Sequence, residues 1–149
     1  MTMRIAVASD HAGFPLKAVI TDELTRLGHT ALDLGPVAFQ SVDFPDYAKE
    51  VGIALQTGAA VRGILLCGSG VGMCIAANKM QGIRAAITHD TYSAHQGVEH
   101  DDMNVMCLGS RIIGEEVARE LVRAFVQAEF QPEPRFIRRL DKIKALEGK

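Results

Sequence analysis

The 149-residue sequence contains no tryptophan, and aromatic residues make up only 5% of it. Its hydrophobic runs all fall short of the roughly 20 residues that a membrane-spanning helix needs, so we expect no such helix. The apolar run near the N-terminus is too short for a signal peptide, which predicts a cytosolic protein.

Neither sign of charge is in large excess. Sixteen lysines and arginines face 18 aspartates and glutamates, for a formal net charge of −2. A broad nucleic-acid or anionic-membrane surface needs a basic patch, and this balance argues against one. We therefore expect small molecules and other protein chains as partners.

Cysteine is also scarce: Cys67, Cys74 and Cys107 form neither a CxxC pair nor a zinc spacing, so we expect reduced thiols. Five other residues carry potential metal ligands: His11, His95, His100, Asp101 and Asp102. None of them follows the HExxH spacing or a comparable one, and we expect no metal site.

Short strand-like runs alternate five times with helical patterns. The predicted strands are residues 5–9, 30–34, 63–67, 84–88 and 105–109, and the predicted helices are residues 15–27, 45–56, 71–80, 91–99 and 115–130. Parallel strands need crossover helices, so the pattern predicts one α/β domain over residues 1–149, a three-layer, Rossmann-like, doubly wound sheet of five parallel strands. We expect the flavodoxin-like order 2-1-3-4-5, with a ligand site where strands one and three adjoin.

A further helix is predicted over residues 133–147, after the helix-ending stretch QPEPR. Its apolar positions follow helical spacing: Phe136, Ile137, Leu140, Ile143 and Leu146. Arg135, Arg139 and Lys142 share one face. Amphipathicity alone favours docking of this helix on its own domain over packing across a dimer.

The stretch GILLCGSGVGMCIAANK, residues 63–79, joins an apolar strand to a helix through a glycine-rich turn. Gly68, Gly70 and Gly72 are spaced GxGxG rather than GxGxxG, and no Walker GK[ST] follows. Only Asp90, about 20 residues further on, suits a nucleotide fold. The turn can instead direct backbone N–H groups at an anionic oxygen, with the Ser69 hydroxyl as a further donor.

Cys67 lies at the junction of the strand and this turn, where the field of the helix start favours a reactive thiolate. A packed strand cysteine is an equally good interpretation. Cys74 and Cys107 lack that setting, and we expect them to be inert.

Asp10 and His11 end the first strand, opposite Cys67 at the predicted switch point. They suit proton acceptance and anion binding, although a helix N-cap explains Asp10 equally well. We also place His100 on this carboxyl edge, although loop histidines usually have no role. Together these groups suit proton abstraction beside the carbonyl of a phosphorylated substrate.

Five stretches carry a family resemblance: SDHAGFPLK (9–17), VDFPDYA (42–48), GILLCGSGVGMCIAANKMQGIRAA (63–86), NVMCLGSR (104–111) and RFIRRLDKI (135–143). Over nearly its whole length the chain resembles the type B ribose-5-phosphate isomerases and their galactose-6-phosphate and allose-6-phosphate isomerase relatives. The resemblance implies an α/β/α fold, no cofactor, and a homodimer or dimer of dimers. It also implies active sites shared between subunits, with the last helix crossing to the partner.

The resemblance further implies interconversion of ribose 5-phosphate and ribulose 5-phosphate through a cis-enediolate, with Cys67 as the base. Ser69 and the turn amides would hold the enediolate oxygen, His100 of the neighbouring subunit would assist ring opening, and Asp10 would bind a sugar hydroxyl. The implied substrate-binding residues are His11, Tyr47, Gly68, Gly70, Gly72, Asp101, Asn104, Arg135 and Arg139.

Four positions distinguish this chain within the resemblance. Met73 stands where some members carry a glutamate base, which indicates the cysteine-dependent group. Phe44 replaces a tyrosine, Phe136 a histidine and Asp101 an asparagine, and the extra carboxylate of Asp101 bears on substrate preference. The alternatives are an isomerase of erythrose 4-phosphate, allose 6-phosphate or galactose 6-phosphate, a non-catalytic sugar-phosphate or nucleotide-binding module, or a subunit that needs a paralogous partner.

Overall fold

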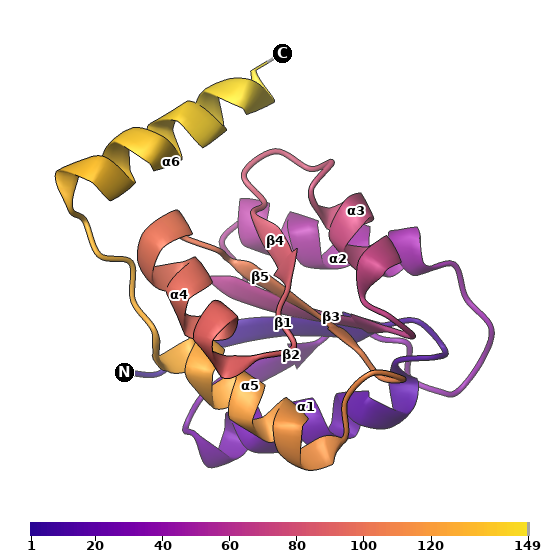
Figure 1. Cartoon of the computed structure of the whole chain (residues 1–149). Helices are drawn as coiled ribbons and strands as arrows, with labels where there is room; N and C mark the ends of the chain where they lie inside the picture. The colour runs from indigo at the N-terminus through magenta and orange to yellow at the C-terminus, as the bar shows by residue number, and fades with distance from the viewer. Residues whose placement is uncertain (149) are drawn as a thin grey trace.

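The computed structural model describes residues 1–148 as a five-stranded parallel sheet with helices on both faces (Figure 1). The strands are β1 (Arg4–Ser9), β2 (Thr30–Asp33), β3 (Arg62–Cys67), β4 (Ala85–Ile87) and β5 (Val105–Gly109). The helices are α1 (Phe14–Arg26), α2 (Phe44–Gln56), α3 (Val71–Ala77), α4 (Thr91–Asp101), α5 (Glu115–Gln127) and α6 (Pro134–Glu147). Among the helices of residues 1–148, none has the length and apolar character that crossing a bilayer requires. The predicted fold class is confirmed.

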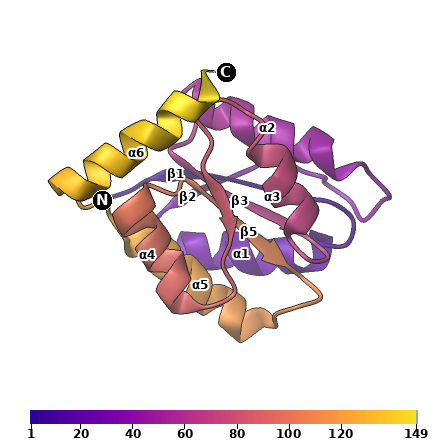
Figure 2. The ribbon, with the colours of Figure 1, turned by 45° about the horizontal axis from the view of Figure 1, so that its top comes forward.

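Alternate residues of each central strand face opposite core layers. Ile64 and Leu66 of β3 pack on the side covered by α1, α4 and α5, whereas Leu65 and Cys67 pack on the side covered by α2 and α3. The two helical layers are seen on opposite sides of the sheet in Figure 2. Because strand side chains alternate, a strand covered on both faces must be apolar along its buried part, as β3 is from Gly63 to Cys67.

The strand order is 2-1-3-5-4, which corrects the predicted order 2-1-3-4-5. β3 pairs with β5 from Gly63 to Cys67, and β4 forms the edge of the sheet. Right-handed crossovers in opposite directions must use opposite faces of a sheet. Since α3 leads outward to β4 on one face, α4 leads back to β5 on the other. The predicted adjacency of β1 and β3 is confirmed.

Two helices end three residues earlier than predicted, for tertiary reasons. The predicted helix 115–130 ends at Gln127, where the Arg62 guanidinium donates to the carbonyl oxygens of Phe125 (2.6 Å) and Ala128 (2.7 Å). These bonds satisfy carbonyls that a helix end leaves open. The predicted helix 71–80 ends at Ala77, because the Asn78 side chain binds both backbone polar groups of Ala85 at 2.8 Å.

The last helix, α6, stands apart from the three layers (Figure 1). It touches its own chain near both ends: the Phe136 ring stacks on His100 of α4, and the Glu147 carboxylate accepts a hydrogen bond from the Gly82 N–H at 3.1 Å. A cavity of about 410 Å³ lies between α6, α4 and the segment around β4. The helix therefore covers its own chain only in part.

Candidate active site

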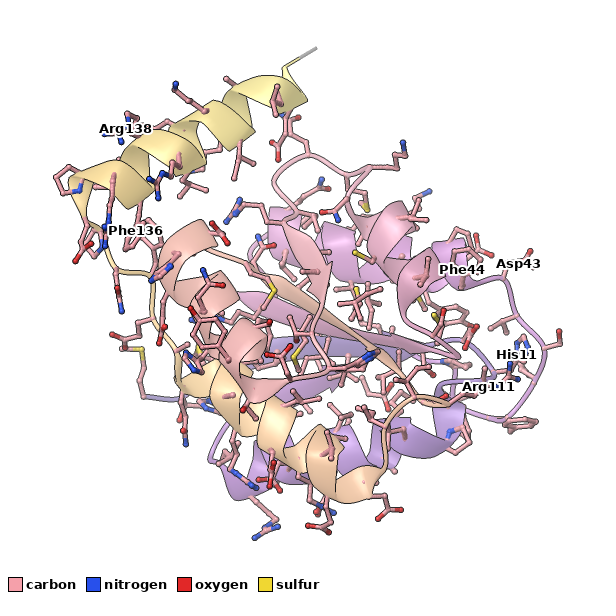
Figure 3. All side chains as sticks on the ribbon, in the orientation of Figure 1. His11, Asp43, Phe44, Arg111, Phe136 and Arg138 are labelled. Atoms are coloured by element: carbon pink, nitrogen blue, oxygen red, sulfur yellow. The ribbon has the colours of Figure 1, made fainter. Side chains whose placement is uncertain are left out.

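A cavity of about 440 Å³ opens at the carboxyl ends of β1 and β3. It is lined by Asp10, His11, Ala12, Phe44, Cys67, Gly68, Ser69, Gly72, Arg111 and Ile112. Figure 3 shows His11, Phe44 and Arg111 at the same end of the molecule. The cavity occupies the topological switch point, where open α/β sheets bind their ligands.

Cys67 is the last residue of β3, and its side chain is buried. Its Sγ atom accepts a hydrogen bond from the Gly70 N–H at 3.0 Å. Gly70 has a φ of 84°, and an added Cβ would lie 3.2 Å from the Leu108 carbonyl carbon. Glycine is needed at this position both for its conformation and for lack of space. The thiol is thus held at the start of α3 with a donor already directed at it.

Ser69 and Phe44 also line the cavity. The Ser69 hydroxyl accepts a hydrogen bond from the Val71 N–H at 3.2 Å, which leaves its own proton free to donate. An added Cβ at Gly72 would lie 2.7 Å from the Phe44 ring. The ring therefore packs closely on the glycine turn and narrows the cavity beside Cys67.

Asp10 and His11 bring a carboxylate and an imidazole to the cavity. One oxygen of the buried Asp10 accepts a hydrogen bond from the Gly13 N–H at 2.9 Å, so the residue also caps the turn that leads into α1. Nδ1 of His11 accepts from the Val42 N–H at 3.4 Å. A neutral His11 ring therefore carries its proton on Nε2, where it can donate to an anion.

The loop after β5 crosses the site, and sequence reasoning missed its contribution. Ser110 donates from its N–H to the Cys67 carbonyl (2.8 Å) and from its hydroxyl to the Ala12 carbonyl (2.6 Å). Arg111 donates its N–H to the Gly68 carbonyl (3.0 Å), and its guanidinium lies over Gly68. The predicted strand order placed the end of β4, not of β5, beside β3. The available signal was the pair Ser110 and Arg111 directly after the fifth strand.

His89 supports this loop from behind. Its Nε2 atom accepts a hydrogen bond from the Gly109 N–H at 2.9 Å, and an added Cβ at Gly109 would lie 2.7 Å from the Ser69 backbone. Burial lowers the pKa of His89, and the nearby Asp90 carboxylate opposes this only in part. The neutral ring is therefore the form that accepts, and it acts on the site through Gly109.

His100 lies outside this cavity. It is in the last turn of α4, which leads into the amino end of β5, so the expected position on the carboxyl edge is wrong. Asp101 follows it and lines the cavity under α6. The Asn104 side chain is engaged by backbone, donating to Gly82 O at 2.9 Å and accepting from the Arg84 N–H at 2.7 Å.

Three more candidates also lie elsewhere in the chain. Arg135 and Arg139 are exposed on α6, and Tyr47 lines a separate hollow beside Asp43. The Asp90 carboxylate caps α4 by accepting from the Ser93 N–H at 2.7 Å, a role that does not need a nucleotide. Within residues 1–148, no three His, Cys, Asp or Glu side chains are grouped to hold a metal ion.

Cys74, which the sequence predicts to be inert, is half-buried and has polar hydrogen-bond partners, the Ala85 carbonyl and the Asn78 amide. A hydrogen bond with the Cys107 thiol lowers the pKa of Cys74 to about 7, although partial burial opposes the shift. The same hydrogen bond, together with burial, raises the pKa of Cys107. Cys74 is therefore partly ionised near neutral pH, whereas Cys107 stays a thiol.

Comparisons with known proteins extend over nearly the whole chain. A family model described as Ribose/Galactose Isomerase matches residues 5–143. A D-erythrulose-4-phosphate isomerase from Pectobacterium atrosepticum is 44% identical over 131 residues, covering 87% of this chain and 86% of the relative. Ribose-5-phosphate isomerase B from Escherichia coli is 40% identical over 144 residues, covering 97% and 96%. A Mycoplasma genitalium ribose-5-phosphate isomerase B structure with bound ribulose-5-phosphate has a TM-score of 0.92 at 38% identity, covering 98% of this chain and 97% of that one.

Proposed function

Since this chain belongs to the ribose/galactose isomerase family, we propose that it is an aldose–ketose isomerase that interconverts ribose 5-phosphate and ribulose 5-phosphate without a cofactor. The observation that carries the proposal is the position of Cys67. Its buried Sγ atom lies in the switch-point cavity and accepts a hydrogen bond from the Gly70 N–H. The E. coli relative is a ribose-5-phosphate isomerase B, and the M. genitalium enzyme binds ribulose-5-phosphate. These relatives support the pentose assignment.

In this mechanism the Cys67 thiolate removes the C2 proton of the open-chain aldose, and the electron pair forms the C1–C2 double bond of a cis-enediolate. The charge develops on the C1 oxygen, which the Ser69 hydroxyl and free N–H groups of the turn can stabilise. A proton then passes from the C2 hydroxyl to the C1 oxygen, and the thiol returns the first proton to C1. The product is the ketose, and the thiolate is regenerated.

We further propose that the active unit is a cytoplasmic homodimer, with residues 133–147 packing on the partner. His100, Arg135 and Arg139 lie outside the Cys67 cavity of their own chain, so a second copy is needed to bring them to it. β4 is the edge strand of the sheet, and α3 nearby exposes the apolar side chains of Val71 and Ile75. Exposed apolar side chains beside the edge of a sheet suit a protein interface.

A four-carbon substrate is the second candidate. The P. atrosepticum relative is a D-erythrulose-4-phosphate isomerase, and Asp101 adds a carboxylate beside His100. Comparing kcat/KM for ribose 5-phosphate and erythrose 4-phosphate decides between the two, because an extra carbon changes contacts in the transition state.

The first experiment measures conversion of ribose 5-phosphate by EDTA-treated protein, with Cys67→Ala and the matched control Cys74→Ala. We expect turnover by the wild type and the control, and a loss of about a hundredfold or more in Cys67→Ala, since the base is gone. Equal activity of Cys67→Ala and the wild type would refute the assigned base. Tight nucleotide binding without exchange of a sugar C2 proton would instead favour the binding module.

Mixing two variants that are each inactive on ribose 5-phosphate tests the shared site. Cys67→Ala and His100→Asn, unfolded together and refolded, form mixed dimers that contain one intact site of two. Random pairing restores about a quarter of the wild-type activity. No recovery beyond the sum of the separate variants would contradict a shared site.

A further inference from the structure

The two histidines of α4 each have a hydrogen-bond partner four residues away, and the two partners have opposite character. Nδ1 of His95 lies 3.0 Å from Oε1 of Glu99, a carboxylate that accepts, so this Nδ1 carries a proton. Nδ1 of His100 lies 2.9 Å from the amide nitrogen of Gln96, which can only donate. A neutral His100 ring must therefore carry its proton on Nε2.

The plane of the His100 ring is held from another direction. The ring stacks on Phe136 with centroids 4.2 Å apart and an angle of 19° between the planes. Phe136 is itself only 4% exposed, and the Arg135 guanidinium lies 4.7 Å from its ring centroid. The hydrogen bond from Gln96 holds the Nδ1 side of the imidazole, and the stack on Phe136 holds the orientation of the ring plane. Nε2 is the ring nitrogen left for a ligand.

We propose that Gln96 is a positioning residue that keeps His100 in the Nε2–H form, so that His100 is the proton donor in furanose opening. This inference rests on the proposed function, in which His100 reaches the sugar bound by a second copy. A histidine acts as an acid at a chosen atom only if that nitrogen holds the proton, and the partner of the other nitrogen decides this.

The ring-opening step balances with water as the only other reactant. The C1–O4 bond breaks, its electron pair passes to O4, and O4 takes the proton from Nε2 of His100. The O–H electron pair of the anomeric hydroxyl forms the C1–O1 double bond, and its proton is released to water. Water returns a proton to Nε2 as O4 takes the first one, so the neutral ring is restored without forming a free imidazolate.

The two directions of the reaction separate this step from the isomerisation. Ribose 5-phosphate is mainly a furanose, whereas ribulose 5-phosphate cannot close such a ring because its C5 oxygen carries the phosphate. Gln96→Met keeps the length of the side chain and removes the donor. We expect it to lower kcat/KM for ribose 5-phosphate by about tenfold or more, and to leave initial turnover of ribulose 5-phosphate within about twofold.

Glu99→Gln is the matched control, because it changes the partner of His95 on the same helix and leaves His100 alone. We expect normal rates in both directions. An equal loss of activity on ribose 5-phosphate and ribulose 5-phosphate in Gln96→Met would overturn the proposal, because a general structural defect affects both substrates. No loss on either substrate would overturn it as well.

Two-bond 1H–15N NMR spectra read the tautomer directly, with the His100 signals assigned by His100→Asn. We expect the Nε2–H pattern in the wild type and a shift towards Nδ1–H in Gln96→Met. A wild-type His100 protonated only on Nδ1 would overturn the proposal. Wild-type protein inactive in both directions would refute the proposed function itself, and the spectra would then test the hydrogen-bond assignment separately.

Discussion

The Sγ atom of Cys67 lies 3.0 Å from the backbone nitrogen of Gly70 and accepts its hydrogen bond. The bond joins the end of β3 to a residue in the left-handed conformation just before α3. Because the donor belongs to the backbone, the position of the sulfur depends on the shape of the glycine turn. Activity should therefore be sensitive to backbone changes here that barely affect the fold.

Gly70→Ala tests this dependence. An alanine at positive φ costs about 1–2 kcal/mol, and its Cβ would press on the Leu108 backbone, so the turn should shift and carry the donor away from Cys67. We expect kcat to fall about tenfold or more, with a smaller change in KM. Gly58→Ala is the control. Gly58 also has a positive φ, of 80°, but no atom lies within 4 Å of the position of an added Cβ. Similar losses of stability with equal activity in both variants would argue against the role of the Gly70 donor.

Arg111→Met should weaken binding of a phosphorylated sugar, because it removes a charged donor from the cavity lining. Hydrogen bonds to charged groups contribute about 1.5–3 kcal/mol, so we expect KM to rise roughly tenfold or more with less effect on kcat. Steady-state kinetics provide the measurement. Arg4→Met is the control, because Arg4 lies at the amino end of β1, at the other end of the strands from the cavity. An unchanged KM for Arg111→Met would remove this residue from the binding site.

The setting of His89 predicts that the free energy of unfolding and kcat/KM both fall in acid. Burial lowers its pKa, so the unfolded chain binds the proton at a higher pH than the folded protein does. The stabilisation is complete above the ordinary histidine pKa of about 6.5 and is lost as pH falls through the lowered folded value. The protonated ring can no longer accept the Gly109 N–H, and the loop beside Ser69 should loosen.

His89→Gln offers an amide oxygen that does not titrate, and should flatten the acid side of both Tm and kcat/KM below about pH 6.5. His29→Gln is the control: burial also lowers the pKa of His29, whose Nδ1 accepts from the Met3 N–H at 3.1 Å. It should change the pH dependence of Tm but not that of kcat/KM. Identical acid profiles for His89→Gln and the wild type would contradict the prediction.

Cys74 should react with iodoacetamide near neutral pH, because its hydrogen bond with Cys107 lowers its pKa to about 7. Peptide mapping by mass spectrometry should find Cys74 modified and Cys107 protected. Cys107→Ala removes the hydrogen bond and should slow the labelling of Cys74 at pH 7, because less of it is ionised. Equal labelling rates with and without Cys107 would show that the bond does not govern this thiol.

Local patterns in the chain were sufficient for the elements and for half of the site. Short, mostly apolar runs predicted the strands, and Pro15 and Pro45 marked the first turns of α1 and α2. The turn CGSGVG placed Cys67 and Ser69 at a strand end, and the switch-point rule brought Asp10 to the same cavity. These inferences need only the residues of one turn and a general rule for parallel sheets.

Tertiary structure decided three features: the order of β4 and β5, the presence of Arg111 in the cavity, and the position of His100 outside it. An amphipathic pattern shows that a helix has one buried face, but not which face of the sheet it covers. The side taken by α4 sets the direction of its crossover, and so decides which loop lies beside β3. That choice depends on packing between residues far apart in the chain, which no local pattern records.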